Sequence, residues 1–400
     1  MRHVKKARML HILFFTVVIF LSSLAFAQGG LAHFPFPPSL SDEVRFWKTV
    51  FGTYDRRQVL LHDDKCLNVL YQVLDFSKIG ERKDLSPKQK EEIIHAQVAN
   101  VREKITVSLE HLAQGVQREK LTPEEKYYEK MFLSCSARRK KPLSTEYKGA
   151  QKRIRVQVGQ RSNLQSAIAK SAQTLGDIEA VFESYGLPGE LTALMFIESM
   201  FNPKALSEIG ASGLWQFMPR IGKEYVPMNS FWDGRNDPIH ASDGAARLLK
   251  DLHRRTGDWA LAVNSYHSGL GRIEKAWKKL KTKDIAVIIH EYDDPAYGFW
   301  SRNYYPEFLA VAEILKRQKE TFGATENDLL EQYDIVRTPD FLNLPEMAGR
   351  LALDMKTLRR LNPAIRSEVF NGGLPLPPDY PLKVPKGMGY PVALATGHPP

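Results

Sequence analysis

The chain contains very little cysteine: Cys66 and Cys135 are the only two among 400 residues. The histidines are scattered and combine with neither cysteine at a spacing typical of a zinc site. We therefore expect no metal and no other cofactor. The two cysteines can form one disulfide if the chain reaches an oxidising compartment. The sequence is equally compatible with two free buried thiols, so their state stays open.

Long apolar runs are also scarce, with one exception at the N-terminus. The basic residues MRHVKKAR precede MLHILFFTVVIFLSSLAFA, which ends in Ala25-Phe26-Ala27. This order is typical of a signal peptide, predicted here for residues 1–27, with cleavage before Gln28. An uncleaved membrane anchor is the alternative, because the run is almost long enough to cross a bilayer. Both interpretations predict export to the periplasm or cell envelope.

The whole chain has a net charge of +10. Positions 1–27 contain no acidic residue and four Lys and Arg residues, so they contribute +4 of this charge. Removal of that segment leaves +6. Much of the surplus lies in residues 137–155, ARRKKPLSTEYKGAQKRIR. The stretch is either a solvated linker or a surface that attracts an anionic wall polymer or membrane. Export argues against nucleic acid as the partner.

The N-terminal half shows mostly helical spacing of its apolar residues. Residues 28–40 are rich in Pro and Gly and predict an extended leader. Helical spacing then continues to about Lys130, including the segment CLNVLYQVLDF at 66–76. A further helix is predicted to start at Thr122, as N-cap, followed by Pro123. We interpret residues 28–150 as one α-helical N-terminal region.

Residues 151–325 form a second predicted region, also mainly helical. The segment IRVQV predicts a short strand or extended lead-in, and helices are expected at 162–172, 176–185, 238–253 and from Trp259. Residues 330–387 differ, because two short strand patterns at 333–338 and 380–387 enclose two helical ones. Residues 388–400 lack periodicity and predict a tail.

One carboxylate stands inside an apolar run, at Glu198 in LMFIESMFNP. On a helix ended by Pro203, Glu198 shares a stripe with Leu194 and Ile197 and lies at the rim of a buried face. Partial burial raises a carboxyl pKa, which is what a general acid for glycosidic cleavage requires. The alternative is an exposed glutamate at a helix end.

Candidate binding residues follow in two Gly-containing segments. The segment KALSEIGASGLWQFMP brings Ser207, Trp215 and Gln216 close in sequence to Glu198. Ser and Gln can hydrogen-bond a carboxyl group or a substrate amide, and an exposed Trp can stack on a sugar. The segment AVNSYHSGLGR adds Tyr266 and His267. The alternative is that the apolar side chains of these two segments pack in the hydrophobic core.

These segments carry a resemblance. The patterns I-E-S-x-F-N-P, S-x-x-G-A-S-G-L-W-Q-F-M-P and G-D-W-x-L-A-x-x-S-Y-H-S-G resemble the lytic transglycosylases, within them the membrane-bound lytic murein transglycosylase D group. The resemblance implies a lysozyme-like catalytic domain over 151–325. It implies that Glu198 is the catalytic acid and that Ser207, Gln216 and Tyr266 match site residues. His267 stands where the family more often has Asn.

The resemblance also implies a reaction on peptidoglycan glycan strands that needs one carboxylate. Glu198 would protonate the bond between N-acetylmuramic acid and N-acetylglucosamine, and a 1,6-anhydro ring would form without water. An ordinary glycosidase needs two carboxylates, for which Asp233, Asp237 and Asp243 are nearby candidates; Asp237 is better explained as a helix N-cap. A lysozyme-type hydrolase, an inactive glycan-binding protein and a chitin-active enzyme remain alternatives.

The C-terminal pattern L-x-x-x-A-x-x-L-x-x-D-x-x-x-L-x-x-L-N-P resembles a LysM repeat, the βααβ fold that binds N-acetylglucosamine-containing glycans. The usual Gly-Asp/Glu-Thr opening is replaced by Arg337-Thr338-Pro339. A small structural cap is the alternative, and export disfavours a DNA-binding helix-turn-helix. The predicted fold is therefore mainly α: an α-helical N-terminal region, a lysozyme-like domain and a LysM-like module.

Overall fold

A computed structural model describes residues 31–139, 142–323 and 332–397, with the backbone alone at 136–139. The predicted signal peptide at 1–27 lies outside the described residues. The described part is mainly helical, as the sequence predicts. Within it, no helix combines the length and the apolar character needed to cross a membrane.

The first part of the chain contributes to a small sheet, of which the sequence analysis predicted only the strand IRVQV. Strands β1 (Gln58–Asp63), β2 (Leu70–Asp75) and β3 (Ile154–Val158) pair antiparallel in the order β2-β1-β3. Val59 of β1 lies opposite both Leu74 and Val158. The helix predicted through 66–76 is therefore wrong. Its apolar spacing suits either structure, and pairing with β1 supplies the backbone hydrogen bonds that decide for a strand.

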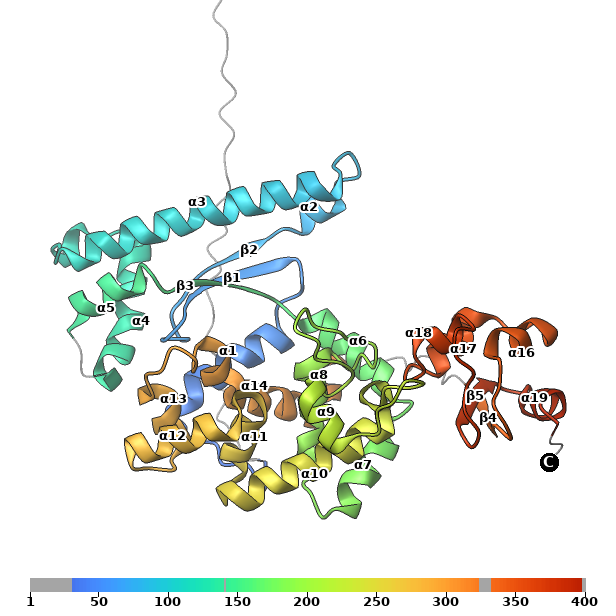
Figure 1. The fold of residues 1–400 in the computed structure, drawn as a ribbon. Coiled ribbons are helices and arrows are strands. Elements are labelled where there is room, and N and C mark those ends of the chain that lie inside the picture. The colour runs from blue at the N-terminus through green and yellow to red at the C-terminus, as the bar shows by residue number, and fades with distance from the viewer. Residues whose placement is uncertain (1–30, 140–141, 324–331, 398–400) are drawn as a thin grey trace, which may run out of the picture. The chain divides into compact units, whose positions relative to one another are not determined.

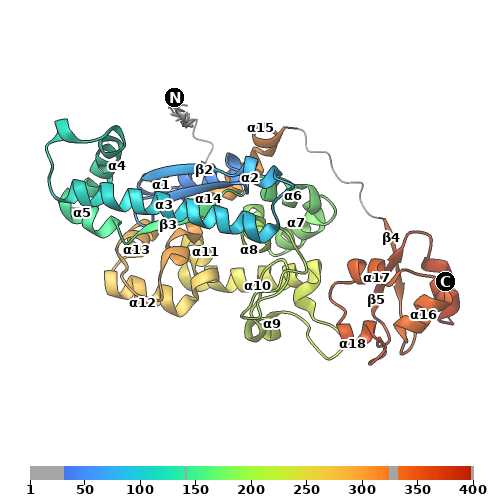
Figure 2. The same ribbon diagram turned by 90° about the horizontal axis from the view of Figure 1, so that it is seen from above.

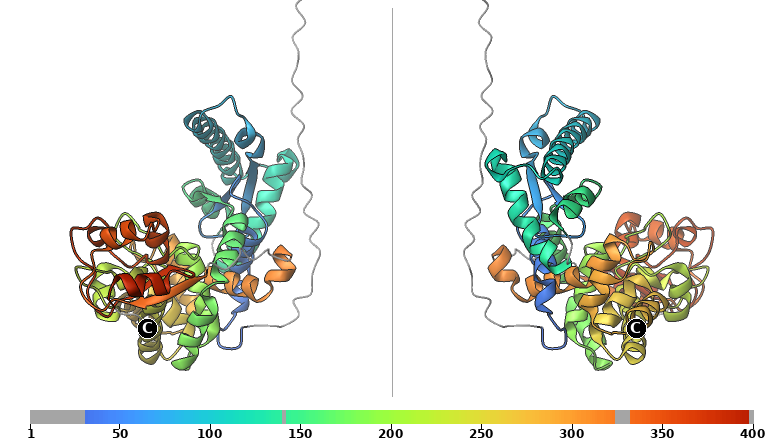
Figure 3. Two further views of the ribbon diagram at one scale, coloured as in Figure 1. Left: turned by 90° about the vertical axis from the view of Figure 1, so that its right-hand side faces the viewer. Right: turned by 90° about the vertical axis from the view of Figure 1, so that its left-hand side faces the viewer.

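Helices cover this sheet and enclose a core of their own. The long α3 packs Ile105 and Leu109 against Leu61 of β1 and Tyr71 of β2; it runs along the strands in Figure 1 and is seen end on in Figure 3. The helices of this part are α2 (Ser77–Glu81), α3 (Pro87–Ala113), η2 (Arg118–Lys120), α4 (Pro123–Arg139) and α5 (Leu143–Ala150).

A disulfide between Cys66 and Cys135 joins the β1–β2 connection to α4, which settles the question that the sequence left open. The bond closes a loop with a sequence separation of 69 residues. In the chain-entropy model such a cross-link stabilises the fold by about 4 kcal/mol. The predicted start of α4 is confirmed: the Thr122 hydroxyl accepts from the Glu125 amide, and the Glu125 carboxylate accepts from the Thr122 amide.

The main domain begins earlier than predicted, because residues 31–52 belong to its core, to which Leu60 and Leu67 also contribute. Trp47 of α1 (Ser41–Gly52) donates from Nε1 to Asn303 Oδ1 of α14 (Phe299–Lys316) at 3.1 Å, and Tyr305 donates to the carbonyl of Pro35 at 2.7 Å. The predicted single region 28–150 is thus divided between two cores. Contacts with residues far away in the sequence decide which core each segment joins, so the local sequence patterns could not predict it.

The helices of the main domain agree with the four predicted ones to within a few residues. Asp237 caps α10 as predicted, accepting from the amides of Ile239 and His240. The elements are η1 (Pro38–Leu40), α1 (Ser41–Gly52), α6 (Arg161–Ser171), α7 (Leu175–Ser184), η3 (Gly189–Ala193), α8 (Leu194–Ser199), α9 (Pro219–Tyr225), η4 (Gly234–Asn236), α10 (Pro238–Thr256), α11 (Trp259–Ser268), α12 (Leu270–Leu280), α13 (Ile285–Glu291), α14 (Phe299–Lys316) and α15 (Gln318–Phe322).

The C-terminal module has the predicted strand–helix–helix–strand order with two additions. Its elements are β4 (Tyr333–Arg337), α16 (Leu344–Arg350), α17 (Met355–Leu361), α18 (Ser367–Phe370), β5 (Pro381–Pro385) and α19 (Gly389–Ala395), grouped around the β4–β5 pair in Figure 2. The expected tail is wrong for 389–395. Val392 is fully buried in the module core, and the Gly389 amide donates to Asp334 Oδ2 at 3.1 Å.

Candidate active site

Glu198 lies in the last turn of α8, a helix shorter than predicted. Three buried residues, Leu194, Met195 and Phe196, anchor the helix in the core, while Glu198 is half-buried. The helix ends at Ser199 rather than near Pro203. The cause is visible in the backbone, since Met200 and Phe201 both adopt left-handed φ angles of 50° and 54°. Such strain in residues other than glycine is concentrated at functional sites.

The neighbour that acts most directly on Glu198 comes from α14. Tyr304 is 3% exposed and donates its hydroxyl to Glu198 Oε1 at 2.6 Å. Burial raises the pKa of Glu198 to about 7, and the Tyr304 hydrogen bond opposes part of that rise. Burial and the Glu198 charge together raise the pKa of Tyr304 well above its usual value. Glu198 can therefore both hold and release a proton near neutral pH.

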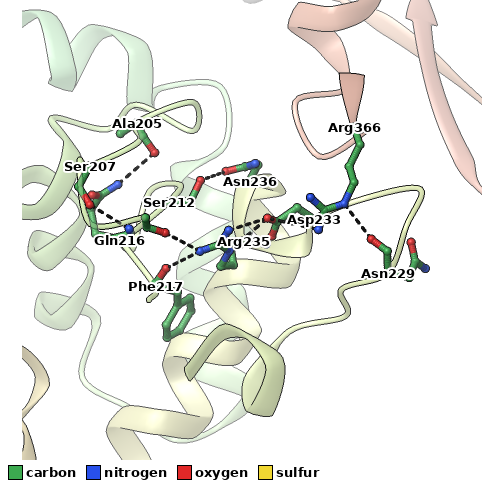
Figure 4. Close-up of polar contacts among 12 residues, drawn as sticks. Ala205, Ser207, Ser212, Gln216, Phe217, Asn229, Asp233, Arg235, Asn236 and Arg366 are labelled. Atoms are coloured by element: carbon green, nitrogen blue, oxygen red, sulfur yellow. Dashed lines mark hydrogen bonds and ion pairs between the residues drawn. The ribbon is translucent and has the colours of Figure 1, made fainter. Parts of the chain in front are cut away.

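The loop between α8 and α9 holds three of the predicted binding residues, Ser207, Trp215 and Gln216, of which Ser207 and Gln216 are labelled in Figure 4. The Ser207 hydroxyl accepts from the Ala211 amide at 2.9 Å. Gln216 has a left-handed φ of 48° and donates Nε2 to the carbonyls of Ala205 and Gly213 at 3.2 and 3.0 Å. Both polar side chains thus shape this loop from within.

Trp215 lies away from solvent, which corrects its predicted role in stacking on a sugar. Its side chain is fully buried and stacks on Phe182, with ring centroids 5.3 Å apart and planes 11° apart. Its Nε1 donates to Ser242 Oγ at 2.9 Å. The indole anchors the loop to α7 and α10 instead. Its backbone carbonyl accepts from the Tyr266 hydroxyl at 2.7 Å.

Tyr266 and His267 lie in the last turn of α11, and they contact Trp215 and Tyr304 respectively. Burial, followed by the Glu198 charge, raises the pKa of Tyr266 well above its usual value. His267 stacks on Tyr304 with centroids 4.6 Å apart and planes 20° apart. Burial lowers the pKa of His267, so the imidazole is neutral at pH 7.

The three aspartates considered as a second carboxylate have structural partners. Asp233 forms a buried ion pair with Arg235 at 2.7 Å, and Asp237 is the N-cap of α10. Asp243 accepts from the Tyr185 hydroxyl at 2.6 Å and pairs with Arg247. None of these interactions joins an aspartate to Glu198.

The second carboxylate near Glu198 is Glu307, which the sequence analysis did not single out. Glu307 is 9% exposed, and burial followed by the Glu198 charge raises its pKa to about 8. The sequence pattern that could have pointed to Glu307 is its spacing of three residues from Tyr304, which places both side chains on one face of α14. Pro306 lies in the interior of α14, which begins at Phe299.

Potential metal ligands do not gather anywhere in the described ranges: no group of three or more His, Cys, Asp or Glu side chains is placed to hold an ion there. Glu198 accepts a hydrogen bond from the Tyr304 hydroxyl, the neutral His267 imidazole stacks on that tyrosine, and the Glu307 carboxyl, with its raised pKa, lies on the same helix. These groups suit proton transfer to and from an uncharged substrate.

Comparisons with known proteins agree with this geometry. Residues 179–289 match the family model of the transglycosylase SLT domain. Membrane-bound lytic murein transglycosylase D of Escherichia coli (strain K12) is 28% identical over 203 residues, which cover 47% of this chain and 42% of that protein. A putative tributyltin chloride resistance protein of Alteromonas sp. (strain M-1) is 40% identical over 108 residues, 26% of this chain and 52% of that protein.

Among solved structures, the 70 kDa soluble lytic transglycosylase SLT70 from Escherichia coli matches with 22% identity and a TM-score of 0.31, covering 35% of this chain and 24% of that chain. The chain spans about half or less of the length of the two curated relatives. The matched segment contains Glu198, Ser207, Gln216, Tyr266 and His267. Residues 179–289 thus match the transglycosylase SLT domain, and about half of the chain is similar to membrane-bound lytic murein transglycosylase D.

Proposed function

We propose that this chain is an exported peptidoglycan lytic transglycosylase that uses Glu198 alone as its acid and base. The observation that carries the proposal is the Glu198 carboxyl, with a pKa raised to about 7, held at 2.6 Å by Tyr304 inside an SLT domain. A general acid is most effective when its pKa lies near the working pH.

In the proposed reaction, protonated Glu198 gives its proton to the glycosidic oxygen between N-acetylmuramic acid and N-acetylglucosamine as the C1–O bond breaks. The carboxylate left behind is stabilised by the Tyr304 hydroxyl. It then takes the proton from the C6 hydroxyl of the muramic acid, whose oxygen bonds to C1. The products are an N-acetylglucosamine end and a 1,6-anhydro end, and no water is consumed.

Glu307 argues against the hydrolase alternative. A retaining or inverting hydrolase needs a second, ionised carboxylate as nucleophile or base. With its pKa raised to about 8, Glu307 is mostly protonated at pH 7 and suits neither role. The Asp residues considered as alternatives are engaged in caps and ion pairs. One proton shuttle at Glu198 is therefore the simpler mechanism.

The surroundings supply the proposed substrate contacts. His267 is exposed on one side while it stacks on Tyr304 on the other, so its neutral ring can meet an uncharged N-acetylhexosamine. Ser207 and Gln216 shape the neighbouring loop, and we propose that this loop borders the glycan. The Cys66–Cys135 disulfide and the predicted signal peptide at 1–27 support export to the periplasm or envelope.

The C-terminal module is proposed to be a degenerate LysM-like domain that contacts the same polymer. Its β4-α16-α17-α18-β5 order, which is strand–helix–helix–strand with one short helix added before β5, supports this assignment. It also presents a pocket of about 300 Å³ beside α16, lined among others by Phe341, Glu346 and Arg350. An exposed aromatic ring next to charged groups suits a glycan.

The experiment that tests the proposal is product analysis on purified murein. The mature wild type should release fragments with anhydro ends, each lighter by one water than the reducing ends a hydrolase would leave. Glu198→Gln should fold normally and lose cleavage by roughly two to four orders of magnitude, because the amide cannot shuttle a proton. Reducing ends would support the hydrolase, and unchanged polymer with the wild type would support a glycan-binding protein.

A further inference from the structure

A buried arginine ties the substrate loop together from outside it. Arg235 is 8% exposed, and its guanidinium forms a two-pronged ion pair with Asp233 through Nε and Nη2, at 3.0 and 2.7 Å. Its remaining terminal nitrogen, Nη1, donates to the carbonyls of Gly210 and Phe217 at 2.8 and 3.0 Å. Figure 4 shows these contacts converging on the segment that carries Gln216.

The backbone around Arg235 fixes the same loop a second time. A Cβ on Gly213 would lie 1.8 Å from the Arg235 carbonyl oxygen, and Gly213 has a φ of +82°, so only glycine fits. The Ser212 hydroxyl also donates to Asn236 Oδ1 at 2.7 Å. Residues 210–217 therefore rest directly on η4, and the position of η4 sets the position of the loop.

The C-terminal module holds the residues that precede η4. The Asp233 amide donates to the carbonyl of Ala364 at 2.8 Å, and the Arg366 amide donates to the carbonyl of Phe231 at 2.9 Å. Arg366 Nε donates to the carbonyl of Asn229 at 2.8 Å, and its Nη2 lies 3.8 Å from Asp233 Oδ2. Asp233 thus receives one arginine from the main domain and a second from the module.

We infer that Arg235 is a positioning residue for the substrate loop 205–217, and that the module, through Arg366, completes its support by fixing Asp233. The module then acts on the active site without touching Glu198. The role of loop 205–217 as the substrate loop rests on the proposed function, whereas its mechanical coupling to the module does not.

Hydrogen exchange in the full-length protein tests the coupling without any substrate. Loss of a hydrogen bond made by a charged donor should speed exchange by roughly three- to tenfold. We expect this for the amides of Ser212, Gly213 and Phe217 in Arg366→Gln. The matched control is Arg337→Gln, which removes an exposed ion pair within the module, to Asp379 at 2.9 Å; it should leave those amides unchanged. Equal exchange in wild type and Arg366→Gln would overturn the inference, whatever the enzyme's activity.

Kinetics on short soluble murein fragments add a readout that general destabilisation would not reproduce. Arg235→Lys keeps the charge but cannot hold Asp233 and two carbonyls at once. We expect KM to rise roughly tenfold while the pH dependence of kcat stays that of the wild type, because Arg235 is not in contact with Glu198. A changed pH profile with unchanged KM would contradict the positioning role. If Glu198→Gln stayed active, the proposed function would fail while the exchange result would still stand.

Discussion

Two neighbouring effects set the pKa of Glu198 in opposite directions. Burial raises the pKa to about 7, and the hydrogen bond from Tyr304 lowers it. The acid step needs the protonated carboxyl, so activity should fall as the pH rises through about 7. Tyr304→Phe removes the bond that favours the carboxylate. We therefore expect the descending limb of the profile of kcat/KM against pH to move to higher pH, with a lower maximal rate.

The neighbouring tyrosine provides the control for that measurement. Tyr305 is also buried on α14, but its hydroxyl donates to the carbonyl of Pro35. Tyr305→Phe should leave the descending limb where the wild type has it. A limb that moved to lower pH in Tyr304→Phe, or did not move, would show that this tyrosine does not stabilise the carboxylate.

The residue scale also shows how far sequence reasoning reached. Glu198 was predictable because a carboxylate within an apolar run is rare and needs a reason. The burial of Trp215 was not predictable, because an apolar residue in such a loop can equally well stack on a ligand or anchor the loop to the core. Glu307 and Tyr304 were missed because they lie more than 100 residues away from Glu198, and only the packing of α14 against α8 brings them near.

At the scale of elements, local signals identified helices well and strand pairing poorly. Caps such as Thr122 and Asp237 act within one turn, so the sequence contains them. Strands β1 and β2 depend on each other and on β3, which lies about 80 residues further along the chain. The strands of the C-terminal module were found because turn residues and alternation mark both of them.

The pocket beside α16 gives the module a prediction of its own. In the full-length protein, Glu346→Ala combined with Arg350→Ala should weaken pull-down on insoluble murein by roughly three- to tenfold, through loss of polar contacts. Lys356→Ala with Glu368→Ala removes the same charges from exposed positions outside the pocket. That control should bind as the wild type does. Equal binding by both double variants would favour a structural cap over a glycan-binding module.

The residues that the structure describes form three apolar cores, one for the sheet and α3–α5, one for the main domain and one for the module. The sequence predicts domain boundaries near 150 and 330. The core of the main domain nevertheless includes α1, which lies far before residue 150 and packs along α14. Contacts between distant segments decide such membership, and no window of the sequence contains them.

The protonated carboxyls inside the main core make the stability of the whole molecule depend on pH. The pKa of Glu307 is raised from 4.5 to about 8 on folding, so between these values the folded state binds a proton that the unfolded state has lost. The free energy of unfolding then falls as the pH rises from about 4.5 to 8, and this contribution is complete only below that window.

Glu307→Gln, which cannot ionise, removes this pH dependence. We expect the variant to melt close to the wild type at pH 5 and higher than the wild type at pH 8.5. A gain of only ~1 kcal/mol would shift the melting temperature by about 2–4 °C. Glu320→Gln, at an exposed position on α15, should follow the wild type at both pH values. Parallel melting of Glu307→Gln and wild type across this range would mean that Glu307 is not held protonated in the core.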